Sequence, residues 1–566
     1  MSAVSDKMHS LALRDPELVM RLGRLGSNHQ CRLSFMRILT RRMKRENWEF
    51  TRPVFEVNDN GVGHAVYTAS GPDRAYSLVA FAHDLPPEQR SDRVIATAWD
   101  ATFTLFDGVP TVEEIEQLSK NIPLQEAGRV SVSSLSVSRA NRSVRLWEHM
   151  VDALASGQQP DREMVNQVGY LMRTTAVYGS GKLGSADFEV IAGRPEMAAP
   201  FQAEMLSVFL TRAFVRDLVQ HMANARGGDK AVTLDAGIAR SMGIGNSTGL
   251  GLGPFIINHP VLFNNWIAAK EVAIARVRGL QIASKTEVTL FREVLDRAVL
   301  SAQRWRSEHE VQVEKLADLR ADLAKLSAHV DTADLSNDQP WDRLYNWAND
   351  NLTVEGQESV ASLILEPYGD LVDDLAPTMA DSSSPLPIDG SMKVTVLADL
   401  IKRDYGWALA IDWNKPDTHK LAWYVSAEKL EPRLGDRYGE GLEPYELPLS
   451  PGRDAAALAA ALDEWPADAT LAEFLLRHPE HRFMARRALH LADVPYGEIH
   501  DNTIAATVFP VDFLRFKLGV FGATHFDPRS DRWVRISMFG NAPFPEELSE
   551  RNADFWVYPE LEGELA

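Results

Sequence analysis

The chain has 566 residues, 45% hydrophobic and 24% charged, so it is too long for one hydrophobic core and we expect about two to four domains. The formal net charge of −20 argues against a nucleic-acid partner, because neutralising phosphates needs a basic surface. The single cysteine, Cys31, excludes an intrachain disulfide, and no apolar run reaches the ~18–20 residues of a membrane span. We therefore expect a cytoplasmic protein without a membrane partner.

The two ends of the chain carry opposite charge. Residues 1–52 hold eleven Lys or Arg against five Asp or Glu, whereas residues 543–566 hold seven acids and one Arg. Two interpretations stay open: the ends meet, within one chain or between subunits, or they are two solvated tails.

The first part of the chain predicts a basic helical segment followed by a sheet. Residues 15–46 have a helical pattern rich in Leu, Met and Arg, and residues 48–108 alternate with a period near two between turn clusters. This alternation predicts an antiparallel meander of about four or five strands. Thr111 and Glu114 then form a capping box that opens a short helix.

Residues 138–149 are interpreted as a helix with arginines on one face. Arg139, Arg142 and Arg145 stand three residues apart, and positive charge near a helix start opposes the helix dipole. An anion would relieve that conflict, and it could be a substrate or an acidic loop of the protein itself.

A first glycine-rich stretch follows at residues 170–187. Arg173, Lys182 and backbone amides such as that of Gly181 could cradle an anion, and Tyr178 could transfer a proton. Leu183 stands where a phosphate-binding P-loop needs Ser or Thr for magnesium. Gly179-Ser180 with Asp187 and Glu189 resembles the pattern of nucleotidyltransferases, but the spacing is several residues shorter and no strand–acid–strand pattern flanks it.

The second glycine-rich stretch, residues 241–260, follows an amphipathic helix predicted for residues 200–225. Glycine allows backbone to approach a ligand, and a helix start after the stretch would offer free N–H groups to an anion. Its proposed substrate-binding residues are Gly245, Asn246, Ser247, Thr248 and Gly249. His259 precedes the helix predicted for residues 260–282, which carries Glu271, and both are candidates for proton transfer.

Residues 284–328 are predicted to be helical, opened by a capping box at Ser284 and Glu287. Leucines at 316, 319, 323 and 326 form a short seam, for which packing within the chain is favoured over a coiled-coil arm.

The last third of the chain contains the densest group of histidines. Their spacing does not place them on one helix face, so we expect no metal site there. These are His478, His481, His490 and His500.

Together these elements predict a multidomain α+β protein. We expect a basic helix plus antiparallel sheet in residues 1–135, a mainly helical domain with two glycine-rich loops in 136–335, and a mixed α/β domain with an acidic tail in 336–566.

Three functional hypotheses remain open. The first is a metabolic enzyme, lyase or isomerase, that acts on a small anionic substrate with no redox cofactor, because no dinucleotide-binding fingerprint is present. Its catalytic candidates are Lys182, Tyr178, His259 and Glu271, and Arg142 and Arg173 would bind the substrate. The second is a nucleotide- or phosphate-binding transferase built on residues 179–187. The third is a non-catalytic assembly protein that holds a partner or forms an oligomer through the helical arm of residues 286–328.

Overall fold

A computed structural model gives the fold of most of the chain. It describes residues 11–86, 98–124, 131–174, 188–191, 193–249, 260–379, 388–415, 423–426, 432–434, 446–449, 451–500, 514–528 and 533–561. The fold is mixed α+β, as the sequence predicts.

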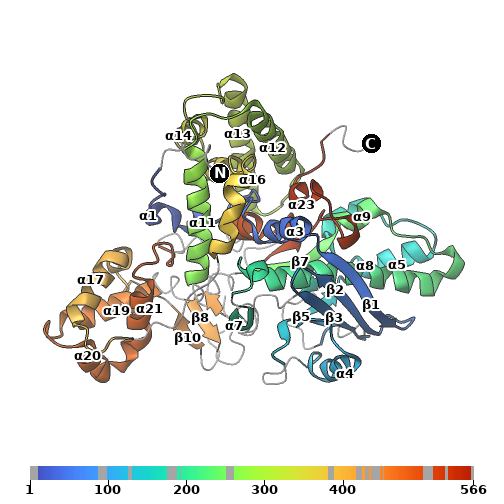
Figure 1. The fold of residues 1–566 in the computed structure, drawn as a ribbon, viewed down its shortest axis with the longest axis horizontal. Helices are drawn as coiled ribbons and strands as arrows, with labels where there is room; N and C mark the ends of the chain where they lie inside the picture. Colours follow the sequence, from blue (N-terminus) through green and yellow to red (C-terminus); the bar gives the residue numbers. More distant parts are fainter. Residues whose placement is uncertain are drawn as a thin grey trace.

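One nine-stranded sheet, with the order β1-β2-β3-β4-β5-β6-β7-β12-β11, organises the fold (Figure 1). Neighbouring strands are antiparallel except β6 and β7, which run parallel. Its strands are β1 (Glu49–Val57), β2 (Gly63–Ser70), β3 (Ala75–Ala82), β4 (Ala101–Asp107), β5 (Ser134–Arg142), β6 (Tyr170–Thr174), β7 (Gly243–Gly249), β11 (His525–Pro528) and β12 (Trp533–Met538). A separate three-stranded sheet has the order β10-β8-β9, from β8 (Trp423–Ser426), β9 (Pro432–Leu434) and β10 (Glu446–Leu449).

Helices make up most of the rest of the described chain. In chain order the α-helices are α1 (Pro16–Val19), α2 (Leu22–Leu25), α3 (Phe35–Arg45), α4 (Val112–Asn121), α5 (Trp147–Ala155), α6 (Arg162–Val168), α7 (Phe188–Ile191), α8 (Gln202–Gly227), α9 (Ala236–Ser241), α11 (Pro260–Arg278), α12 (Lys285–Arg304), α13 (Glu310–Thr332), α14 (Pro340–Asn351), α15 (Val354–Leu363), α16 (Gly369–Val372), α17 (Val394–Asp404), α18 (Gly406–Leu409), α19 (Pro451–Asp463), α20 (Leu471–Arg477), α21 (Arg482–Leu491) and α23 (Asn552–Phe555). Short 3₁₀ turns are η3 (Pro195–Met197), η4 (Gly228–Lys230), η5 (Asp373–Met379), η7 (Pro479–His481) and η9 (Pro545–Glu547), and η8 (Lys517–Phe521) is a π-helix.

The predicted meander is confirmed as strands β1 to β4. Its first turn forms because the Asn58 carboxamide oxygen accepts from the N–H groups of Asn60 and Val62, both at 3.0 Å, while Gly61 adopts a φ of 77°. Helix α8 packs on this part of the sheet, and its Phe214 ring lies 5.7 Å from that of Phe103. The capping box predicted at Thr111 and Glu114 is also present, at the start of α4.

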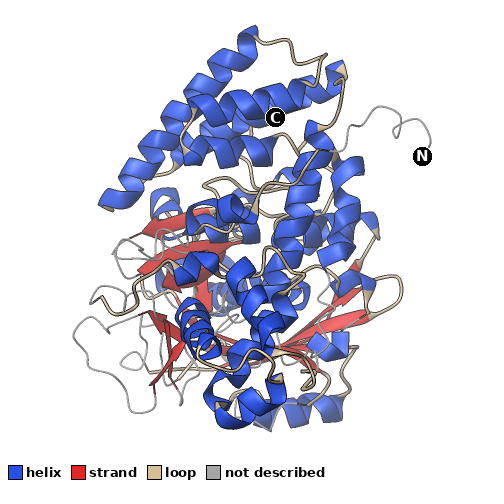
Figure 2. Ribbon diagram, turned by 90° about the vertical axis from the view of Figure 1, so that its left-hand side faces the viewer, coloured by secondary structure: helices blue, strands red, loops and turns tan. Residues whose placement is uncertain are grey.

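The sheet takes strands from every part of the chain. Strands β1 to β4 come from the first predicted domain, β6 and β7 from the second, and β11 and β12 from the third. The boundaries at residues 135 and 335 therefore stay a prediction, while the sheet itself crosses both. In Figure 2 the long helices at the top of the view stand apart from the strands below.

The helical region packs around α15. The leucine seam of α13 is buried within the chain, and the capping box at Ser284 opens α12 as predicted. The start of α15 is capped by a carboxylate from α13: Asp322 Oδ2 accepts from the N–H groups of Thr353 and Gly356, at 3.0 and 3.1 Å. There is no room for a side chain at Gly356, where a Cβ would lie 2.6 Å from that oxygen.

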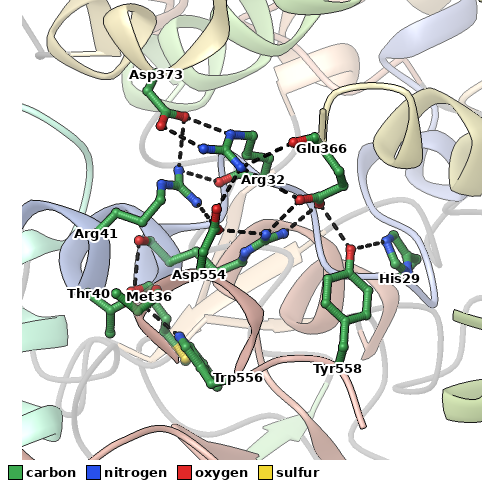
Figure 3. A network of polar contacts seen from close by, with 12 residues as sticks. His29, Arg32, Met36, Thr40, Arg41, Glu366, Asp373, Asp554, Trp556 and Tyr558 are labelled. Carbon is green, nitrogen blue, oxygen red and sulfur yellow. Dashed lines mark hydrogen bonds and ion pairs between the residues drawn. The ribbon is translucent and has the colours of Figure 1, made fainter. Parts of the chain in front are cut away.

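The oppositely charged ends of the chain do meet, within one chain, so that interpretation is confirmed. Arg32, Arg37 and Arg41 all bind Asp554 of α23, at N–O distances of 2.7, 2.9 and 3.0 Å (Figure 3). Burial alone would raise the pKa of Asp554, but the three guanidinium groups hold it well below its usual value. The N-terminal and C-terminal segments are thereby joined beside the sheet.

Two predicted elements differ from the structure. Residues 138–149 are not one helix: β5 continues through Arg142, and α5 begins only at Trp147, because residues 134–142 pair with β4 and β6. The segment 15–46 is likewise broken after α2, and α3 begins at Phe35. Tertiary pairing overrides local helical spacing in the first case.

The glycine-rich stretch at residues 241–260, expected to be a loop, is in part a strand, because residues 243–249 form β7 between β6 and β12. Its glycines are required by close packing. A Cβ at Gly245 would lie 2.6 Å from the Tyr170 ring, and one at Gly243 would lie 2.1 Å from the Met538 carbonyl oxygen. Packing thus explains two of the glycines that suggested a ligand loop.

Candidate functional site at the carboxyl ends of β6 and β7

The two glycine-rich stretches begin side by side. Strand β6 ends at Thr174, which pairs with Asn246 of the parallel strand β7. The chain then continues from β6 into residues 175–187 and from β7 into residues 250–259, both outside the described residues. The carboxyl ends of adjacent parallel strands are a common place for ligand sites, because both following segments leave from the same edge.

A buried lysine lies at this edge. The Lys517 Nζ donates to Asn246 Oδ1 at 3.2 Å and lies 4.8 Å from the centre of the Phe521 ring. The residue is only 1% exposed, and burial lowers the pKa of its amine to about 7. A large part of the Lys517 population therefore carries a neutral amine near neutral pH, which an exposed lysine does not.

The local backbone around Lys517 is unusual. The residue opens the π-helix η8, and its carbonyl oxygen accepts from the N–H groups of Gly522 and Ala523, at 3.2 and 3.1 Å. Single π-helical turns are rare and often lie at functional sites. The segment after α2 holds this turn in place, because Cys31 N–H donates to the Gly519 carbonyl at 3.1 Å and Gln30 Nε2 donates to that of Ala523 at 2.8 Å.

Asn246 has a fixed orientation toward the lysine. Its Nδ2 donates to the Thr174 carbonyl at 3.4 Å, which turns Oδ1 toward the Lys517 amine. The Thr174 hydroxyl lies on the same face of the sheet as its register partner Asn246; it is buried, and among the described residues it has no hydrogen-bond partner. A buried hydroxyl without a partner costs free energy, so this one is available to a ligand.

The predicted arginines lie on opposite faces of the sheet. Arg142 pairs in register with Met172, and Arg173 is the next residue along β6, so their side chains point to different sides. Arg142 lies 4.8 Å from the Trp147 ring and 3.9 Å from Asp100. The two arginines therefore do not converge on one small ligand.

Glu271 belongs to a different cluster. Both of its oxygens accept from Arg14, at 2.8 and 2.7 Å, and Arg14 also binds Glu358 of α15 at 2.8 Å. Lys270 binds Glu358 at 3.2 Å. This ion-paired group has a structural explanation, because it attaches the N-terminal segment to α11 and α15.

The remaining predicted site residues are only partly visible. Gly245, Asn246, Ser247, Thr248 and Gly249 all lie in β7, where the backbone of the last three is described but their side chains are not. Lys182, Tyr178, Gly181 and His259 lie outside the described residues, so their catalytic or binding roles stay predictions.

A highly charged cluster lies around α3 and is shown in Figure 3. Arg37 binds Glu366 through two hydrogen bonds of 2.6 and 2.7 Å, and Tyr558 donates to the same carboxylate at 3.0 Å. His29 contacts the Tyr558 hydroxyl at 3.1 Å, and burial together with Arg37 lowers the pKa of His29 to about 3. The positive charges of the arginines and the negative charges of the carboxylates neutralise one another in this cluster. It therefore resembles a structural ion-pair network more than a substrate site.

The histidines of the last third occupy separate settings. His478 Nδ1 lies 3.2 Å from Glu480, while the His500 ring stacks on Trp407 with 5.6 Å between centroids. Among the described residues, no group of three or more His, Cys, Asp or Glu side chains is placed to hold a metal ion.

Comparison with known proteins adds no assignment, since no family model, curated protein or solved structure matches the chain. None of the helices in the described part of the chain combines the length and apolar character needed to cross a membrane.

Lys517 is the residue that sequence reasoning missed. A signal was present, because the lysine interrupts a hydrophobic run, Leu514-Arg-Phe-Lys-Leu-Gly-Val-Phe521, in which apolar neighbours predict burial. Its partner Asn246 lies 271 residues away in sequence, so no local pattern could join the two.

Proposed function

We propose that the protein is an enzyme, with lyase or isomerase chemistry, that acts on a small carboxylate substrate at the carboxyl ends of β6 and β7. The observation that carries the proposal is the buried amine of Lys517, which donates to Asn246 at this edge and whose pKa burial lowers to about 7. A base whose pKa lies near the working pH transfers protons most effectively, and burial adjusts the pKa of Lys517 in that direction.

Each group at this edge has a distinct role in the proposal. Lys517 removes a proton from a carbon of the substrate and becomes an ammonium, whose charge is stabilised by the substrate carboxylate. Asn246 positions the amine, and the Thr174 hydroxyl hydrogen-bonds the substrate. Gly181, Lys182 and His259 lie outside the described residues, so their part in the anion site stays a prediction.

The alternative functions have less support. The nucleotide hypothesis depends on residues 179–187, which lie outside the described residues. The assembly hypothesis needs the leucine seam of α13, and those four leucines are buried inside the chain.

A thermal-shift panel tests the proposed function. We expect at least one small carboxylate, among pyruvate, 2-oxoglutarate, malate, fumarate and citrate, to raise the melting temperature by about 1–3 °C through mass action. Asn246→Ala removes the shift, whereas Asn346→Ala, at an exposed position of α14, retains it. A shift with ATP or GTP and magnesium, and none with any carboxylate, would replace this proposal by the nucleotide hypothesis.

A further inference from the structure

We infer that the protein associates with a second copy of itself through two different surfaces. One is the arginine corner, residues 476–486 of α20 and α21, and the other is the valine corner, residues 109–116 at the start of α4 together with Val132. Each surface exposes apolar side chains among charges of one sign, and the two signs are opposite. The inference is independent of the site at β6 and β7.

Two large apolar side chains project from the arginine corner. Leu476 is 85% exposed and Phe483 is 69% exposed, on either side of the 3₁₀ turn η7. The core of this region does not need them, because other faces of the same helices fill it with residues such as Phe474 and Met484. Large apolar side chains exposed close together mark interaction surfaces.

Exposed arginines accompany these two side chains. They are Arg477, Arg482 and Arg486. None of them forms an ion pair with a described residue. Arg482 donates to the Pro479 carbonyl at 2.9 Å, and its guanidinium lies 4.4 Å from the centre of the Phe483 ring.

The carboxylates beside the arginine corner already have local partners. Glu473 accepts from the Thr470 N–H at 2.7 Å in a capping box, and Glu480 lies 3.2 Å from His478. Residues 482–491, which form α21, contain no acidic side chain. The arginine corner therefore carries positive charge that no carboxylate of the described chain balances.

The valine corner lies where β4 ends and α4 begins. Val112, the first residue of α4, is 68% exposed, and Val132 is 79% exposed. The Asp107 N–H donates to the Ser133 carbonyl at 2.8 Å, which holds the segment with Val132 against the end of β4. Val109, in the connection from β4 to α4, is also exposed. These valines form a second apolar surface without a partner in the described chain.

The charge of the valine corner is negative. Glu113 and Glu116 are exposed and form no ion pair with a described residue. Glu116 follows Val112 by four residues, so the two side chains share one face of α4. Glu114 is engaged in the capping box, and Lys120 lies in the last turn of the helix. This corner thus offers carboxylates beside apolar groups, which complements the arginine corner in charge.

One chain cannot join its own two corners. In Figure 1 α20 and α21 lie at the lower left and α4 lies at the lower right, at different ends of the molecule. A second copy supplies the missing surface, because every copy carries one corner of each kind. Contact removes the apolar side chains from water and sets arginines against carboxylates. Contact between two arginine corners would instead oppose like charges.

Analytical ultracentrifugation of the full chain tests this inference. The contact is small, so we expect weak association, with a mass that rises between about 5 and about 300 µM protein at low ionic strength. Salt at about 0.5 M should weaken it, because exposed charges are screened. Phe483→Ser should weaken association at least about tenfold, and Val313→Ser, at an exposed valine of α13, should leave it unchanged. Wild-type protein that stays monomeric throughout this range would overturn the inference.

Charge reversal tests which two surfaces meet. One variant carries Arg482→Glu and Arg486→Glu, and the other carries Glu113→Arg and Glu116→Arg. Each variant alone opposes like charges and should stay monomeric, whereas an equimolar mixture should associate about as strongly as the wild type. All four side chains are exposed, so melting temperatures close to that of the wild type are expected and show that the fold is retained. A mixture that stays monomeric would show that the two corners are not partners.

Two other results would assign the contact elsewhere and overturn the inference. Dissociation by Val313→Ser, with Phe483→Ser unchanged, would place the interface on the arm of α12 and α13. Wild-type protein that stays monomeric, yet sediments with vesicles of phosphatidylcholine and phosphatidylglycerol unless Phe483 is changed to Ser, would assign the arginine corner to a lipid surface.

Discussion

Replacing Lys517 by Met is expected to stabilise the protein at neutral pH. The amine pKa is about 7 in the folded state and about 10.4 in an unfolded chain, so burying the protonated amine carries a free-energy penalty. At about 1.4 kcal/mol per pKa unit, that penalty is about 5 kcal/mol below pH 7. Methionine fills a similar volume beside Phe521 without a charge.

The stability gain of Lys517→Met is expected to decrease as the pH rises. Below about pH 7 both states of the wild-type protein bind the Lys517 proton, and the stability advantage of Lys517→Met is at its largest. Between about pH 7 and about pH 10 the unfolded wild-type chain binds more protons than the folded one, so wild-type stability rises and the gap closes. Urea denaturation of both proteins across this pH range measures the difference between their free energies of unfolding. The other titrating groups are the same in both proteins, so their contributions cancel in that difference.

Lys402→Met is the matched control, because its side chain is 56% exposed and the substitution should change stability by no more than about 0.5 kcal/mol at any pH. A Lys517→Met protein that is less stable than the wild type, or whose advantage does not change with pH, would show that the amine is charged in the folded state.

Replacing Arg37 by Ala is expected to destabilise the protein by about 3–5 kcal/mol. The Arg37 side chain is fully buried and binds both Glu366 and Asp554, at 2.6 and 2.9 Å. Its removal leaves the Glu366 and Asp554 carboxylates with less positive charge beside them in a buried setting. It also removes an ion pair that holds the C-terminal segment with Tyr558. The shift of the urea midpoint measures the effect.

Arg551→Ala is the control for this prediction, because its side chain is 64% exposed and its ion pair with Glu293 is 3.8 Å long. Exposed pairs of this kind contribute less than about 1 kcal/mol. If Arg37→Ala moves the midpoint no further than Arg551→Ala does, the ionic contacts between the chain ends do not stabilise the fold.

Local patterns predicted those parts of the fold in which neighbours in sequence decide the structure. The meander, the capping boxes at Thr111 and Ser284 and the long helix α8 all follow from spacing within a few residues. The contact between the chain ends was predicted by charge alone, because opposite charges on two segments are visible in composition.

The candidate site could be predicted only in part. Asn246 and the glycine-rich stretches were predicted as site candidates from their residue types. That residues 243–249 form a strand could not be predicted in the same way, because β7 depends on pairing with β6 and β12, whose residues are far away in sequence. Gly245 was predicted as a ligand contact; the structure shows that its missing side chain makes room for Tyr170, and its predicted role in binding stays a prediction. Lys517 reaches Asn246 only through the π-helix that the segment after α2 holds in place.

Proton exchange between substrate and solvent tests the central claim most directly. Wild-type protein is incubated in D₂O with a mixture of small carboxylates, and loss of C–H signals is followed by proton NMR. The account predicts exchange at one carbon of at least one acid, slowed at least about hundredfold in Lys517→Met and unchanged in Lys402→Met. No exchange with the wild-type protein, or equal exchange with Lys517→Met, would contradict it.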